Sequence, residues 1–135
     1  MRITILLLAM LFSVAMFSQR STKKIKVDFE LEKQKFTGLW ADVEKNNYYT
    51  VILYNKKDGF QFVNFSFLEN QAPKEYVLEV EKFFSKIIVK TKLTSPNDKK
   101  WEVYCEYLVI DDYTIEVIYS GSYNATHQLF RKYIH

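Results

Sequence analysis

The chain has 135 residues, a formal net charge of +3 and 26% charged side chains, which is the composition of a folded globular protein. This length is enough for one domain and hardly for two. So small a positive charge gives no reason to expect a nucleic-acid partner. A single cysteine excludes an internal disulfide framework and a zinc site built from several thiolates.

The first eighteen residues have the pattern of an export signal. Arg2 supplies a positive charge, and an apolar run interrupted by two hydroxyl side chains extends from Ile3 to Phe17. This run is shorter than the roughly 20 apolar residues that a membrane-spanning helix needs. Small residues place signal cleavage after Ala15 or after Ser18, and no later segment is apolar enough to span a membrane. We therefore expect a periplasmic or extracellular protein; a buried N-terminal helix or an uncleaved anchor is the alternative.

Residues 19–35 precede the predicted β domain, residues 36–135, as a tail or a short extra element. Apolar and charged side chains alternate from Ile25 to Glu32, which is the periodicity of a strand. Asp28 could equally cap a short helix that ends before Gly38. The sequence leaves both interpretations open.

From Gly38 onward the sequence predicts eight β-strands with short connections. Aromatic and β-branched residues are concentrated in them, and the connections include the hairpin signal Asp58-Gly59. The predicted strands are 38–44, 48–55, 60–67, 76–82, 86–93, 101–110, 114–120 and 127–133. Residues 76–87 could also form a helix, because four apolar side chains would then share one face.

This succession predicts a mainly β fold, an antiparallel eight-stranded meander barrel. No alternation of strands with helices is present, so a parallel sheet is not expected. Eight strands can close into a barrel just wide enough for packed side chains or one small ligand, and closure removes the exposed sheet edges.

Histidine and cysteine give little support for catalysis. His127 and His135 are the only histidines, and their spacing does not suggest a metal pair. Cys105 alternates with apolar residues on a predicted strand and is expected to be a small buried hydrophobic side chain. The sequence alone does not exclude a nucleophile pair of Cys105 with His127.

The carboxylates are scattered over the predicted strands. Glu79 and Glu81 share one strand face, as do Glu102 and Glu106, and we expect both pairs on a solvated exterior. We find no nucleophile elbow, phosphate-binding glycine loop or zinc-protease motif. The sequence therefore predicts no enzyme, no cofactor and no metal site.

Tyrosines are the most suggestive remaining feature, since ten of them are spread over most predicted strands. A tyrosine inside a barrel offers a small ligand an apolar ring and one hydrogen bond, although it can equally fill a core or pack on a sheet surface. The ligand-lining candidates, taken from the more apolar face of their strands, are Tyr49, Val51, Leu53, Ile115, Val117 and Tyr119.

Both ends of the predicted domain carry a recognisable arrangement. Gly38 and Trp40 open its first strand, and Arg131, its only arginine, lies in the last. This resembles the calycin superfamily of lipocalins, fatty-acid-binding proteins and avidins: lipocalins carry a G-x-W on the first strand and a lone arginine or lysine on or just after the last. The more specific likeness is to small secreted bacterial lipocalin-like domains.

The resemblance implies that Gly38, Trp40 and Arg131 are structural residues. The indole and guanidinium would stack by cation–π attraction and close one end of the barrel, with the guanidinium donating to backbone carbonyls. The mature chain is shorter than a typical lipocalin, which implies trimmed loops and a small or filled cavity.

These observations lead to two hypotheses. The first is an exported, lipocalin-like, non-catalytic protein that binds a small hydrophobic ligand. The alternative is a structural or interaction protein of the bacterial envelope, with a filled barrel and no ligand.

Overall fold

The computed structural model describes residues 27–45, 47–67 and 72–132. The predicted export signal, residues 19–26 and His135 lie outside the described residues. Helix α2 (Phe29–Gln34) comes first, and it settles the open choice for this segment in favour of a helix. The Asp28 carboxylate caps it by accepting from the backbone N–H groups of Glu30 and Leu31 at 3.1 and 3.2 Å.

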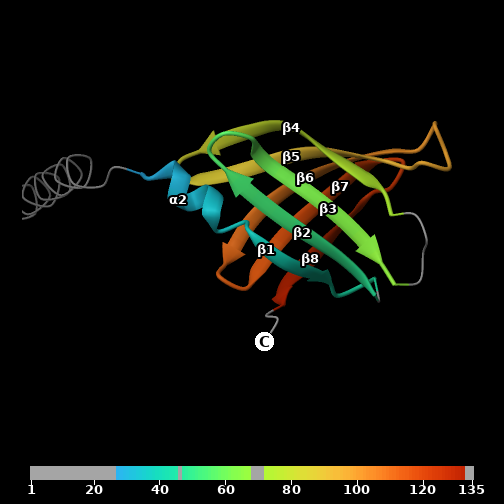
Figure 1. The fold of residues 1–135 in the computed structure, drawn as a ribbon, viewed down its shortest axis with the longest axis horizontal. Helices are drawn as coiled ribbons and strands as arrows, with labels where there is room; N and C mark the ends of the chain where they lie inside the picture. Colours follow the sequence, from blue (N-terminus) through green and yellow to red (C-terminus); the bar gives the residue numbers. More distant parts are fainter. Residues whose placement is uncertain (1–26, 46, 68–71, 133–135) are drawn as a thin grey trace, which may run out of the picture.

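Eight strands follow α2 in antiparallel order (Figure 1). They are β1 (Gly38–Asp42), β2 (Tyr48–Asn55), β3 (Gly59–Ser66), β4 (Lys74–Phe83), β5 (Lys86–Thr94), β6 (Glu102–Asp111), β7 (Thr114–Gly121) and β8 (Ala125–Lys132). The prediction of a mainly β, eight-stranded antiparallel meander is confirmed. Residues 76–87 form a hairpin of β4 and β5 and not a helix, with Phe84 at its tip at a positive φ of 55°.

The sheet is a nearly closed barrel with the strand order β3-β2-β1-β8-β7-β6-β5-β4. Closure depends on the pairing of the first strand with the last, in which Trp40 lies opposite Arg131. The seam lies between β3 and β4, which end the hydrogen-bonded order. A side-chain hydrogen bond crosses it, from Asn64 Nδ2 on β3 to Glu75 Oε1 on β4, at 2.8 Å.

Alternating side chains of the strands fill the barrel interior. In β5 the buried residues are every second one, and the same period of two holds for β6 and β7. Trp40, Ile52, Val89, Ile115 and Val117 are completely buried in this core. The opposite face of β5 and β6 carries ion pairs between half-exposed Lys and Glu side chains.

Helix α2 covers one end of the barrel, which we call the closed end. The hydroxyl of Tyr54 on β2 donates to the Glu30 carboxylate of α2. Phe36, just after the helix, is 1% exposed and packs edge-on against Phe60 with ring centroids 5.5 Å apart. Within the described ranges, no helix is long and apolar enough to cross a membrane.

Arg131 connects the segments that meet at the closed end. Its guanidinium carbon lies 4.4 Å from the Trp40 ring centroid. Its N–H groups donate to the carbonyls of Thr37 at 2.5 Å, Lys35 at 2.8 Å and Asp112 at 2.8 Å. One side chain thus links β8 to the segment after α2 and to the β6–β7 turn, and the Trp–Arg contact implied by the resemblance is present.

Gly38 makes room for this guanidinium. A Cβ at this position would lie 2.7 Å from Arg131 Nη1, and the backbone has a φ of +139° that side-chain-bearing residues rarely adopt. The Arg131 head group could yield only by giving up its bonds to the carbonyls. Glycine is therefore required at position 38 for two reasons: a side chain would clash with Arg131, and the backbone has a positive φ.

The variant Gly38→Ala is expected to lower the free energy of unfolding by about 2–3 kcal/mol, because it adds a clash with Arg131 to the backbone strain. The measurement is urea denaturation followed by tryptophan fluorescence. Gly59→Ala is the matched control, since Gly59 also has a positive φ of 74° but open space around its Cβ position. Strain alone should cost this control about 1 kcal/mol. Equal losses in the two variants would contradict the account.

Candidate functional site

The end of the barrel opposite α2 carries the candidate site. We call it the open end and define it by residues 43–45 and 47, between β1 and β2, and residues 122–124, between β7 and β8. Residues 68–71, between β3 and β4, lie outside the described residues. The side chains that converge here are polar, aromatic or charged, in contrast to the apolar core.

A buried histidine–carboxylate pair lies just inside the open end. His127 on β8 and Asp42 on β1 are 2% and 0% exposed in their side chains, and their Nδ1 and Oδ2 atoms are 2.7 Å apart. A carboxylate can only accept, so His127 Nδ1 carries the proton. In the neutral ring, Nε2 then accepts from the hydroxyl of Tyr123, 2.7 Å away.

Glu44 adds a second carboxylate at the rim. Its Oε2 lies 3.1 Å from His127 Nε2, while its side chain is 64% exposed. This oxygen can accept from Nε2 only when the imidazole carries a second proton. Asp42, Glu44 and His127 lie together, but no group of three or more His, Cys, Asp or Glu side chains in the described part of the chain could hold a metal ion.

Three tyrosine rings surround the ammonium of Lys45. The Nζ atom lies 4.9 Å from the ring centroid of Tyr123, 5.4 Å from that of Tyr48 and 5.8 Å from that of Tyr119. We call these three residues the tyrosine cage. Tyr119 and Tyr123 also pack edge-on against each other, with centroids 5.5 Å apart.

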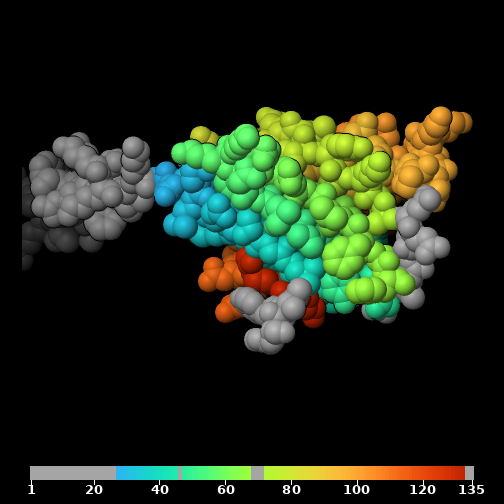
Figure 2. Space-filling model, viewed as in Figure 1, coloured from blue at the N-terminus to red at the C-terminus, as the bar shows by residue number. Residues whose placement is uncertain are grey.

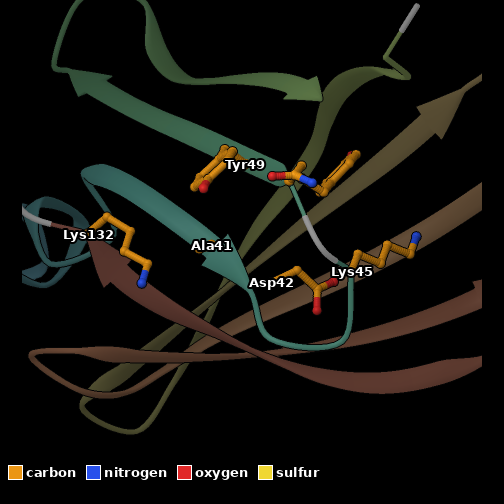
Figure 3. Close-up of a pocket in the computed structure, with 7 residues that line it drawn as sticks. Ala41, Asp42, Lys45, Tyr49 and Lys132 are labelled. Atoms are coloured by element: carbon orange, nitrogen blue, oxygen red, sulfur yellow. The ribbon is translucent and has the colours of Figure 1, made fainter. Parts of the chain in front are cut away.

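A pocket of about 350 Å³ opens beside the cage (Figure 3). It is lined by Ala41, Asp42, Lys45, Asn47, Tyr48, Tyr49 and Lys132. Figure 3 shows Tyr49 and Lys132 on either side of Ala41, and Lys45 extending from the loop that follows Asp42. The pocket runs from the outer face of β1 and β2 to the open end and combines aromatic rings with two ammonium groups.

A second polar cluster lies inside the barrel at the β3–β4 seam. Glu75 Oε2 accepts from the Thr91 hydroxyl at 2.5 Å and from the Tyr107 hydroxyl, and Oε1 accepts from Asn64. Asn64 in turn accepts from Thr50 at 2.6 Å. Burial raises the pKa of Glu75 above 4.5 although these donors oppose the shift.

Burial also determines the chemistry of two neighbouring interior groups. The pKa of the Cys105 thiol is raised to about 12, mainly because the sulfur is buried and secondarily because Glu75 is close. The pKa of Tyr119 is raised as well, again mainly by burial. Both side chains are therefore neutral at physiological pH, and Cys105 lies in the core as a small buried residue.

The six predicted ligand-lining residues fall on two different faces. Ile115, Val117 and Tyr119 point into the barrel and are 0%, 0% and 7% exposed. Tyr49, Val51 and Leu53 alternate with the buried Thr50 and Ile52 and therefore lie on the outer face. Of the six, Tyr49 lines the pocket and Tyr119 belongs to the tyrosine cage. The more apolar side of β2 is thus its outer side.

The residues that sequence reasoning missed are Asp42, Lys45, Glu75 and the pairing of His127. One signal was available: Asp42 comes two residues after Trp40, and His127 two residues before Leu129, so in a strand each shares an inward face with an apolar neighbour. A buried carboxylate requires a partner. The partner is 85 residues away in the sequence and is found only in the folded barrel.

Comparisons with protein-family models, with curated proteins and with solved structures found no match to this chain.

The variant Glu75→Gln tests the seam cluster through the pH dependence of stability. Because the folded-state pKa is raised, Glu75 stabilises the fold fully below its unfolded pKa, and this contribution is lost as the pH rises through the folded value. Glutamine keeps an oxygen for Thr91 and Tyr107, and an amide flip of Asn64 presents its oxygen to the new NH2 group. The free energy of unfolding of the variant should therefore rise relative to wild type between about pH 4 and pH 8.

Urea denaturation across this pH range measures the difference. Glu79→Gln is the matched control, because Glu79 is exposed on the same strand. A pH-independent difference for Glu75→Gln, or the same trend in both variants, would contradict a raised pKa at Glu75.

Proposed function

We propose that this chain is an exported, lipocalin-like, non-catalytic binding protein that holds a small molecule with an apolar body at its open end. The proposal includes membership of the calycin superfamily, supported by the Gly38, Trp40 and Arg131 arrangement and by the strand order. It also includes export, supported by the signal pattern in residues 1–18.

The observation that carries the proposal is the asymmetry of the barrel's two ends. The closed end is covered by α2 and fastened by Arg131. The open end has a pocket of about 350 Å³ beside buried ionisable groups, whereas a pocket of about 380 Å³ at α2 is lined by the single segment Val27–Glu30 and lies beside no buried ionisable pair within the described residues. Ligand sites commonly combine a concave space of roughly 300–1,000 Å³, aromatic walls and a few polar groups. Buried ionisable side chains beside such a space are a further mark of a functional site.

A non-catalytic role is supported by the state of the candidate nucleophile. The Cys105 thiol remains protonated at neutral pH and is 1% exposed, so it has neither the charge nor the access that a nucleophile needs. Both ring nitrogens of His127 are already engaged, Nδ1 with Asp42 and Nε2 with Tyr123.

Native mass spectrometry tests the binding proposal. Protein purified from its own host is expected to carry a small organic molecule, and Tyr49→Ser should reduce the bound fraction by about tenfold because it removes an aromatic wall of the pocket. Tyr49 stacks on Phe65 outside the core, so the substitution leaves the interior intact. Tyr76→Ser, at a 52% exposed position on β4, is the matched control.

Two results would overturn the binding proposal. One is protein that is consistently free of any bound molecule. The other is a bound molecule whose occupancy falls equally in the Tyr49 and Tyr76 variants.

A second candidate function, an interaction protein of the bacterial envelope, is favoured by the outer surface of β1, β2, β3 and β8. Figure 2 shows much of this surface, from the side on which β1, β2 and β3 face the reader. It includes Leu53, Val63 and Phe67, which are 50%, 51% and 74% exposed. We define the apolar outer face as Leu39, Ala41, Tyr49, Val51, Leu53, Val63, Phe65, Phe67 and Phe130.

Site-specific photo-crosslinking in the native host tests this second function. A crosslinking residue at Val63 should give one discrete heavier species, because exposed apolar faces of this extent mark interaction sites. The control position is Tyr104, which is 41% exposed on the charged outer side of β6. The same products from both positions, or no product from Val63, would argue against an interaction face.

A further inference from the structure

We propose that the tyrosine cage is a binding site for an organic cation of the quaternary ammonium class, and that Lys45 occupies it in the unliganded protein. This inference rests on the proposed function, because the cage adjoins the pocket at the open end and shares Tyr48 and Lys45 with it. It adds the chemistry of the ligand's head group, which the pocket alone does not specify.

The geometry of the cage is that of a cation site. A cation within about 6 Å of an aromatic ring centroid is attracted by the ring's negative face. Lys45 Nζ meets this condition with Tyr48, Tyr119 and Tyr123 at once, at 5.4, 5.8 and 4.9 Å. The three rings come from β2, from β7 and from the β7–β8 connection, so separate parts of the barrel surround one point.

Two of the three rings of the cage, those of Tyr119 and Tyr123, are held in place independently of Lys45. The hydroxyl of Tyr123 is fixed by its hydrogen bond to His127, which is in turn fixed by Asp42. Tyr119 is only 7% exposed and packs against the His127 ring, with centroids 5.1 Å apart. A preorganised cage loses little conformational entropy when a ligand enters.

The local charge also suits a cation. Two carboxylates flank the His127 ring: Glu44 Oε2 lies 3.1 Å from Nε2 at the rim, and Asp42 Oδ2 lies 2.7 Å from Nδ1. The other ammonium of the pocket, that of Lys132, lies on the far side of Ala41 from Lys45 (Figure 3).

Lys45 is an exchangeable occupant of this cage. It is exposed, lies in a bend outside the strands, and forms no ion pair with a carboxylate among the described residues. Its ammonium is strongly hydrated and carries three N–H donors that aromatic faces do not satisfy well. A trimethylammonium group has the same charge and no donors, so it loses less hydration when the rings surround it.

The experiment compares choline with its uncharged isostere 3,3-dimethyl-1-butanol by isothermal titration calorimetry at constant ionic strength. Lys45→Ala is expected to bind choline about tenfold more tightly than wild type does, because the competing ammonium is gone. The same variant should prefer choline to the alcohol by about tenfold, because only the cation gains the ring attraction. Lys57→Ala, which removes an equal charge from an exposed turn, should leave choline binding unchanged.

The rings are tested in the Lys45→Ala background. Adding Tyr123→Leu should lower choline affinity by about tenfold. If that variant fails to fold, because Tyr123 also bonds His127, Tyr48→Leu serves the same purpose. Choline binding that Lys45→Ala does not strengthen, that equals binding of the alcohol, or that survives loss of a ring would overturn the cage.

The failure of this inference can be told apart from failure of the proposed function. A co-purifying molecule that is lost in Tyr49→Ser, together with no choline binding by Lys45→Ala, overturns the cage and supports the pocket. Choline binding without a co-purifying molecule supports the cage. The absence of both overturns the cage and the proposed function together.

Discussion

The guanidinium of Arg131 is the group on which the rest of the structure depends. It stacks on Trp40 and donates to three backbone carbonyls that come from two separate connections of the chain. A guanidinium suits this position because its planar donors can stack on a ring and bond in several directions at once, which an ammonium cannot do. The contact also pairs the last strand with the first, and that pairing turns a meander into a barrel.

Because α2 and Arg131 close one end of the barrel, its buried polar side chains lie near the other end and at the β3–β4 seam. Buried ionisable groups lower stability unless they are paired, so each has its partners: Asp42 with His127, and Glu75 with Thr91, Tyr107 and Asn64. An apolar core of the same shape would be simpler to fold. Burying these groups lowers the stability of the fold. Their presence near the open end therefore supports a binding role for that end.

Much of the fold could be predicted from local pattern. The period of two in apolar residues, the hairpin signal Asp58-Gly59 and the lack of alternating helices lead to eight antiparallel strands. The segment before Gly38 could not be resolved, because its apolar residues fit both periods. Its helix is decided by tertiary contacts, the Tyr54 bond to Glu30 and the packing of Phe36, which local pattern does not contain.

The candidate site was harder to predict for a physical reason. On β2 the outer side is the more apolar one, so hydrophobicity alone selects the wrong face for the barrel interior. The cage and the Asp42–His127 pair join residues from opposite ends of the chain, and only barrel closure brings them together.

The central proposal is that the closed end stabilises the fold and that the tyrosine cage at the open end binds an organic cation. Hydrogen–deuterium exchange of the protein, with and without saturating choline, tests it most directly. The account predicts slower exchange in residues 41–49 and 119–127, and unchanged exchange in residues 35–40 and 129–132. Protection of the closed end, or no protection at the open end, would contradict it.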